Sequence, residues 1–115
     1  MSLTIYHNPR CTKSRETLEL LKGKGLEPDV IEYLKTPPTA AELDAVLKKL
    51  GLEPDAIVRT KEDAYATSGL KNPNLSRAEK IAILVKFPIL IERPIVVNGG
   101  KAALGRPPEK VLEII

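Results

Sequence analysis

The sequence predicts an α/β domain in which the first strands are parallel and the last are antiparallel. A strand pattern at 3–6, a helical pattern from Cys11 and a second strand at 29–33 form a strand–helix–strand unit. Parallel pairing of these two strands follows, because a helix carries the chain from one to the next. The β-branched run at 95–97 and the turn signal Asn98-Gly99 then predict a hairpin with Lys101–Leu104.

The first helix should begin directly after a loop that ends the first strand. Asn8-Pro9 breaks the strand, since proline cannot donate to the sheet and restricts the residue before it. Leu18 and Leu21 then follow Cys11 on one helical face. Gly25 is expected just beyond the C-terminus of this helix, where a left-handed residue is common.

The stretch between the second and third strands is predicted to be helical. Thr39-Ala-Ala-Glu42 and Ser76-Arg-Ala-Glu79 are capping boxes, and apolar residues follow each at helical spacing. Gly51 and Pro88 should end these two helices, and a short helix should begin near Thr60. These elements are expected to form an insertion between two parts of one sheet.

The C-terminal segment is predicted to be a last helix that opens at Pro107-Pro108. Its apolar face should consist of Val111, Leu112 and Ile115. The whole order, βαβ, a helical insertion and ββα, is the plan of a thioredoxin-like domain. We therefore expect one domain over 1–115, with the helical insertion roughly at 36–90.

Composition excludes several classes of protein. The net charge of +3 is too mild for a nucleic-acid partner, and there is no run of five or six basic residues. One cysteine and one histidine do not supply the four ligands of a structural zinc site, so we expect no metal. No signal peptide or membrane-spanning stretch is visible. We expect a cytoplasmic protein with no membrane contact, working as a monomer.

Cys11 is the candidate nucleophile. It lies at the start of a helix, where unpaired backbone N–H groups and the helix dipole favour an anion such as a thiolate. Four basic residues surround it in the sequence, and positive neighbours lower a thiol pKa. They are His7, Arg10, Lys13 and Arg15.

Ser14 stands where a redox protein of this kind would carry a second cysteine. Cys11-Thr-Lys-Ser14 therefore cannot form an internal disulfide, and an oxidised Cys11 needs a thiol from another molecule. The Ser14 hydroxyl is a candidate donor to the thiolate or to a bound anion, although serine is also common in a first helical turn. For His7 an ordinary loop histidine remains the alternative.

The segment His7-Asn-Pro-Arg-Cys-Thr-Lys-Ser-Arg15 closely resembles the signature of the glutaredoxin-dependent arsenate reductases. The resemblance continues along the chain in matching order, through Val58-Arg59, Glu92-Arg-Pro-Ile-Val-Val97 and Leu104-Gly-Arg-Pro-Pro-Glu109. Thr12-Lys13 replaces the Gly-Thr pair of the better-known resistance enzymes. The chain thus resembles a less-characterised branch of the family.

The resemblance implies a thioredoxin-like fold and the reduction of arsenate to arsenite. The family nucleophile falls on Cys11, and its histidine and serine fall on His7 and Ser14. The anion-binding arginines of the family fall on Arg59, Arg93 and Arg106. The resemblance also implies a cis Arg93–Pro94 bond, glutathione as co-substrate, glutaredoxin as partner and no bound cofactor.

Arginine suits an oxyanion physically, because its planar guanidinium can donate two parallel hydrogen bonds and stays charged. Two other functions remain open on the sequence. One is a glutathione-dependent thiol transferase that acts on mixed disulfides. The other is a thioredoxin-like regulator that binds RNA polymerase and has no arsenate activity.

Overall fold

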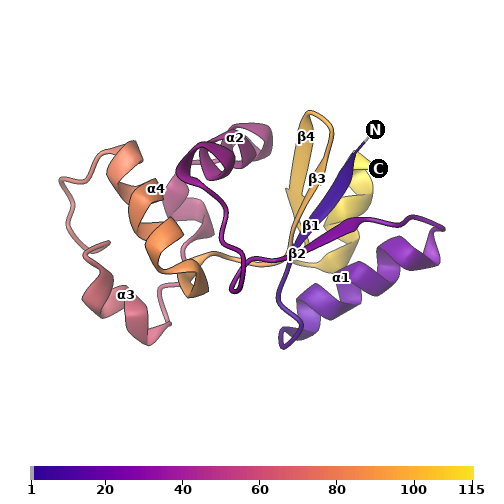
Figure 1. The fold of residues 1–115 in the computed structure, drawn as a ribbon, viewed down its shortest axis with the longest axis horizontal. Helices are drawn as coiled ribbons and strands as arrows, with labels where there is room; N and C mark the ends of the chain where they lie inside the picture. The colour runs from indigo at the N-terminus through magenta and orange to yellow at the C-terminus, as the bar shows by residue number, and fades with distance from the viewer. Residues whose placement is uncertain (1) are drawn as a thin grey trace. The chain divides into compact units, whose positions relative to one another are not determined.

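Four strands form one mixed sheet in the order β2-β1-β3-β4 (Figure 1). The computed structural model describes residues 2–115, which divide into two compact units. The first unit extends to Thr36 and resumes with Arg93–Ile115, and the second is Pro37–Glu92. The elements of the first unit are β1 (Leu3–His7), α1 (Thr12–Gly23), β2 (Asp29–Glu32), β3 (Ile95–Asn98), β4 (Lys101–Leu104) and the 3₁₀ helix η3 (Pro108–Ile114).

Strand pairing in the first unit is as the sequence predicts. β1 pairs with β2 in parallel, and β1 with β3 and β3 with β4 antiparallel. The tight turn between β3 and β4 falls on Gly99 and Gly100, one residue later than expected, because Asn98 still pairs with Lys101. This arrangement confirms the α/β, thioredoxin-like fold class with helices inserted between the second and third strands.

The core of the first unit lies on one face of the sheet. Ile5 and Val96 are opposite each other in the β1–β3 pair, so their side chains share that face. Leu21 of α1 and Val111 of η3 pack in the same cluster, and all four residues are fully buried. Both helices therefore cover the same face, and they lie beside each other in Figure 1.

The last helix differs from the prediction in type and in register. Pro108–Ile114 is a 3₁₀ helix, in which residues three apart lie above each other. Val111 and Ile114 therefore face the core together, whereas Ile115 is 48% exposed. Placing Ile115 on the apolar face was wrong, because that prediction assumed α-helical spacing.

The second unit consists of helices and short 3₁₀ turns. They are α2 (Ala40–Leu50), η1 (Pro54–Ile57), α3 (Asp63–Ser68), α4 (Arg77–Lys86) and η2 (Pro88–Leu90). Both predicted capping boxes are present, with Thr39 and Ser76 each bonded to the backbone N–H three residues on. Gly51 ends α2 in the left-handed conformation, also as expected. The short helix begins at Asp63 rather than near Thr60.

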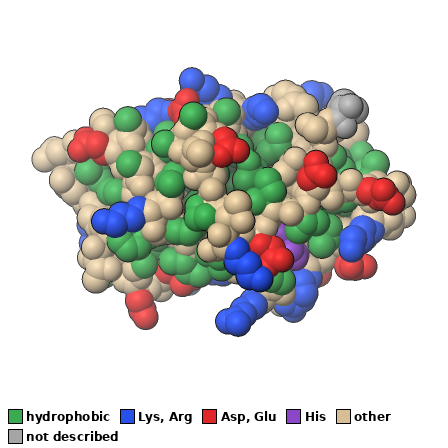
Figure 2. Space-filling model, viewed as in Figure 1, with side chains coloured by type: hydrophobic (Ala, Val, Ile, Leu, Met, Phe, Trp, Pro, Cys, Tyr) green, Lys and Arg blue, Asp and Glu red, His purple; other side chains and the backbone are tan. Residues whose placement is uncertain are grey.

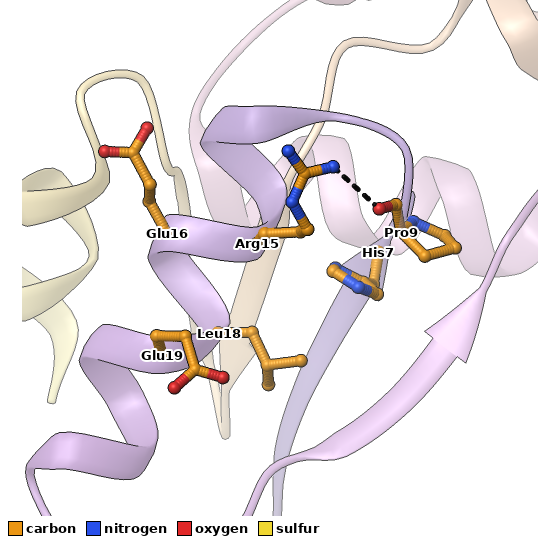
Figure 3. A pocket seen from close by; sticks show the side chains of 6 residues that line it. All are labelled: His7, Pro9, Arg15, Glu16, Leu18 and Glu19. Carbon is orange, nitrogen blue, oxygen red and sulfur yellow. Dashed lines mark hydrogen bonds between the residues drawn. The ribbon is translucent and has the colours of Figure 1, made fainter.

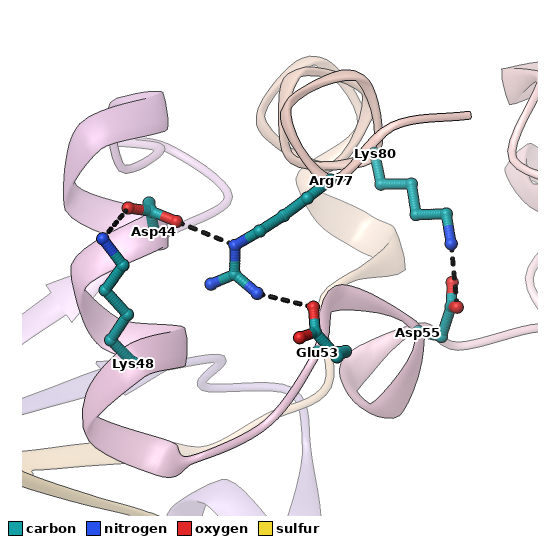
Figure 4. Close-up of polar contacts among 6 residues, drawn as sticks. All are labelled: Asp44, Lys48, Glu53, Asp55, Arg77 and Lys80. Carbon is teal, nitrogen blue, oxygen red and sulfur yellow. Dashed lines mark hydrogen bonds and ion pairs between the residues drawn. The ribbon is translucent and has the colours of Figure 1, made fainter.

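Ion pairs connect the helices of the second unit (Figure 4). Arg77 at the start of α4 donates to Asp44 of α2 at 3.0 Å and to Glu53 at 2.6 Å. Lys80 adds a bond to Asp55 at 2.9 Å. One arginine thus links α4 to two preceding segments. On the face shown in Figure 2, acidic and basic side chains are interspersed rather than separated by sign.

Gly105 should be sensitive to the addition of a single methyl group. A Cβ there would lie 2.5 Å from Thr17 Oγ1 and 2.7 Å from Pro94 Cγ, and the Gly105 N–H already donates to the Pro94 carbonyl. We expect Gly105→Ala to lower the free energy of unfolding by about 1–3 kcal/mol through overpacking, measured by urea denaturation. Gly100→Ala is the control, because a Cβ at Gly100 meets nothing within 4 Å. Equal stability of the two variants would contradict this account.

Candidate active site

Cys11 is the N-cap residue of α1. Its backbone is extended, with φ −93° and ψ 123°, and its carbonyl accepts the Arg15 N–H at 3.0 Å. The Cys11 N–H donates to the Asn8 carbonyl, also at 3.0 Å, which closes the loop between β1 and α1. The side chain is partly buried. The sulfur thus lies where the first N–H groups of the helix are available to an anion.

The thiol pKa of Cys11 is lowered, although burial acts in the opposite direction. Burial is the largest influence and raises the pKa, since it disfavours the thiolate. The Ser14 backbone N–H, the Arg93 guanidinium and the Lys13 backbone N–H together outweigh it, and Arg93 acts both by a hydrogen bond and by its charge. The charged group that favours the thiolate thus lies 82 residues away from Cys11 in the sequence.

The basic residues that flank Cys11 in sequence do not act as predicted. Arg10 is exposed, and Lys13 contributes through its backbone rather than its ammonium group. Arg15 turns back to donate to the Pro9 carbonyl at 2.9 Å and to Thr12 Oγ1 at 3.3 Å. Arg15 therefore stabilises the loop between β1 and α1. It also lines a groove with His7, Pro9, Glu16, Leu18 and Glu19 (Figure 3).

His7 and Ser14 form a buried pair. Ser14 Oγ lies 2.6 Å from His7 Nδ1. Ser14 is 0% exposed and His7 is 6% exposed. His7 lies at the end of β1, on the sheet face that α1 covers, which brings its ring against the first turn of that helix. The Ser14 hydroxyl is thus engaged with His7, while its backbone N–H supports Cys11.

The pKa of His7 is lowered from its ordinary value of 6.5. Burial is the main cause, with Arg15 and Lys22 acting in the same direction and Glu32 opposing them. The imidazole is therefore neutral at neutral pH. It serves as a hydrogen-bonding partner of Ser14 rather than as a cation near the thiol.

Asn8 is a site residue that the sequence analysis did not single out. It is 5% exposed, its N–H donates to Ser14 Oγ at 3.0 Å, and its carbonyl accepts from Cys11. Its side-chain Oδ1 accepts the Arg10 N–H at 3.0 Å, as in an Asx turn. The sequence signal for Asn8 is the Asn8-Pro9 pair, which also marks the end of the first strand.

Arg93 and Arg106 come together in the first unit. Arg93 is 9% exposed and lowers the thiol pKa of Cys11, while Arg106 Nη1 donates to the Arg93 carbonyl at 3.2 Å. The Arg93–Pro94 bond is cis, as expected, and so is Arg106–Pro107. Arg106 thus contacts the backbone of Arg93, and Arg93 is the arginine that acts on the thiol.

Arg59 belongs to the second unit and is bound by two carboxylates. Its Nε donates to Glu62 at 3.1 Å and its Nη1 to Glu92 at 2.7 Å. Burial is the largest single influence and lowers the pKa of Arg59. Glu92 and Glu62 together outweigh it, so the pKa lies above its ordinary value. Neither acidic partner was predicted from the sequence.

Within residues 2–115, no group of three or more His, Cys, Asp or Glu side chains is arranged to hold a metal ion. No helix in this same range is both long and apolar enough to cross a membrane.

The site occurs in a chain whose relatives can be recognised along almost its entire length. Residues 6–114 match the sequence profile of the ArsC family. The chain belongs to the ArsC family. It is 54% identical over 112 residues to Uncharacterized protein YfgD of Escherichia coli strain K12, covering 96% of this chain and 94% of that protein.

Other ArsC relatives carry a functional name. Over 116 residues the chain is 49% identical to Arsenate reductase of Haemophilus influenzae, covering 100% of both. The solved structure titled Arsenate reductase from Vibrio cholerae superimposes with a TM-score of 0.95 at 51% identity, covering 100% of this chain and 98% of that one. The likeness therefore includes both units.

Replacing Arg93 in this ArsC chain should make Cys11 less reactive. Arg93→Gln removes a charge and alters a hydrogen bond that lower the thiol pKa. We expect the pH profile of iodoacetamide alkylation to move upward and the rate at neutral pH to fall severalfold. Arg10→Gln is the matched control and should leave the profile in place, since the exposed Arg10 is not among the groups that act on the thiol. Equal shifts in both variants would refute this assignment.

His7 should make stability depend on pH in the range below its ordinary pKa of 6.5, because its lowered native pKa means that the unfolded chain takes up protons first. The stability is fully present above the ordinary value of 6.5 and is lost as the pH falls below it. His7 is the only histidine in the chain, so urea denaturation of wild type and His7→Asn isolates its contribution. Parallel curves for the two proteins over this range would contradict the prediction.

Proposed function

We propose that this protein is an arsenate reductase, an oxidoreductase that uses Cys11 as its nucleophile. The observation that carries the proposal is the position of Cys11 at the N-terminus of α1, where backbone N–H groups and the Arg93 guanidinium lower the thiol pKa. The relatives named arsenate reductase, at 49% and 51% identity over the whole chain, support the same activity. An activated thiolate beside arginine suits attack on an electrophilic oxyanion.

Arginines suit this substrate for electrostatic reasons. Arsenate carries negative charge, and the attacking thiolate adds more. Arg93 and Arg106, which the first unit joins, are proposed to offset that charge as it develops. Arg59 is proposed as a third ligand of the oxyanion, on the resemblance of Val58-Arg59 to the family pattern.

The first chemical step forms a bond between sulfur and arsenic. The Cys11 thiolate attacks arsenic(V), and one arsenate oxygen leaves as water or hydroxide. Arsenic remains in the +5 state, and no electrons have been transferred. The Ser14 and Lys13 backbone N–H groups hold the sulfur in position for this attack.

Reduction requires two thiols from other molecules, because the chain has one cysteine. Glutathione replaces a second oxygen on arsenic, with release of water. A glutaredoxin thiolate then attacks the glutathione sulfur and forms a mixed disulfide, and the bonding pair of the sulfur–arsenic bond stays on arsenic. Two electrons thus reduce arsenic to +3. Water finally displaces arsenite from Cys11.

His7 and Ser14 are proposed to act by positioning. Their buried contact holds the first turn of α1, whose N–H groups face the sulfur. The scheme needs no bound cofactor or metal, because the thiols supply the electrons. A reducing cytoplasm, where glutathione is abundant, is the proposed setting, and the enzyme is proposed to work as a monomer.

The same thiolate would also suit a glutathione-dependent thiol transferase, since attack on a disulfide sulfur needs the same activated group. A role as an RNA polymerase-binding regulator would not need an activated cysteine. The decisive difference is whether arsenate is turned over.

The deciding measurement is arsenate-dependent NADPH oxidation with glutathione, glutathione reductase and a glutaredoxin present. We expect saturable activity in wild type and its loss, by at least about a thousandfold, in Cys11→Ser, because the hydroxyl is a far weaker nucleophile at neutral pH. Ser68→Ala, a change in the second unit, controls for the handling of variants. Turnover of a glutathionylated disulfide that arsenate does not affect, with no arsenate turnover, would instead indicate the transferase.

A further inference from the structure

Arg59 is held by backbone and side-chain contacts that leave it little freedom. The Arg59 N–H donates to the Leu90 carbonyl at 2.8 Å, and the Glu92 N–H donates to the Ile57 carbonyl at 2.7 Å. Val58 and Ile91 form an antiparallel bridge between these bonds. The two segments therefore present Arg59 and Glu92 to each other at a fixed register. Glu62 completes the group, with its own N–H donating to the Arg59 carbonyl at 3.3 Å.

The three side chains form a partly buried ion group that carries a net charge of −1 from two carboxylates and one guanidinium. Arg59 is 25% exposed, Glu92 24% and Glu62 28%. Charges at this depth are screened less than fully exposed ones, so each carboxylate offsets much of the attraction between Arg59 and another anion.

Two of the N–H donor groups of Arg59 are already used, one by Glu62 and one by Glu92. An arginine binds an oxyanion most strongly through two parallel N–H groups. Glu62 takes Nε, which is one member of such a pair, and Glu92 takes Nη1. A tetrahedral oxyanion would have to compete with Glu62 to use the pair that contains Nε.

We propose that Glu62 and Glu92 control the anion affinity of Arg59, so that an oxyanion binds this guanidinium in competition with their carboxylates. The inference rests on the proposed role of Arg59 as an oxyanion ligand. It makes the two acidic residues determinants of substrate affinity, although neither has to touch the reacting sulfur. We expect wild type to bind oxyanions more weakly than it would without these two carboxylates.

Glu62 is the better residue to change. Glu92 directly precedes Arg93, so its replacement could also disturb the cysteine. Glu62→Gln keeps the length of the side chain and an oxygen that can accept from Nε, and removes only the charge. Glu53→Gln is the control, because Glu53 also pairs with an arginine of the same unit, Arg77, at 2.6 Å, but its side chain is exposed.

The experiment compares the KM for arsenate, in the coupled assay, of wild type, Glu62→Gln and Glu53→Gln. We expect Glu62→Gln to lower the KM roughly three- to tenfold with little change in kcat, because one repelling charge is gone. Glu53→Gln should keep the wild-type KM. Thermal unfolding of all three proteins separates this effect from a loss of stability.

An unchanged or higher KM in Glu62→Gln would overturn the inference and assign the ion group a structural role alone. If wild type does not reduce arsenate at all, the proposed function fails, and calorimetric titration with inorganic phosphate then decides the inference. Tighter phosphate binding by Glu62→Gln than by wild type would support it. Equal binding, or no binding to either protein, would overturn it.

Discussion

A sulfur anion at the start of α1 is stable only if hydrogen-bond donors surround it, and the first unit supplies them from two directions. The helix contributes the backbone N–H groups of Lys13 and Ser14, and the loop before β3 contributes the Arg93 guanidinium. Burial of Cys11 would otherwise favour the neutral thiol. The sheet order, with β3 beside β1, is what brings Arg93 to the end of β1 where the cysteine loop begins.

Buried polar groups around the loop fix the position of the cysteine. Ser14 Oγ accepts the Asn8 N–H and also pairs with His7 Nδ1, so Ser14 connects two other residues that are almost fully buried. A buried polar group without a partner typically costs ~1–3 kcal/mol, which strongly favours this one arrangement. The neutral state of His7 follows from the same burial. The hydrogen bonds that fix the shape of this loop therefore also fix the first turn of α1, whose N–H groups lower the thiol pKa of Cys11.

The second unit uses charge differently. Arg77 connects helices by pairing with two acidic residues, Asp44 and Glu53. The pair with Asp44 is partly exposed, and Glu53 lies at the surface. Arg59 also pairs with two acidic residues, in a group that is more uniformly shielded from solvent. Similar chemistry thus stabilises helix packing in one place and, in our proposal, limits anion affinity in the other. Burial and the backbone register around Arg59 make the difference.

The sequence by itself determined most of the local elements and the position of Cys11 at the start of a helix. Capping boxes, the left-handed Gly51 and the position of Cys11 at a helix start depend on neighbours a few residues away, and such signals are visible in the chain. The tertiary structure decided which charges act on the thiol and which are already paired. Arg93 and Glu92 reach their partners only through folding, because electrostatic interaction depends on distance in space rather than in sequence.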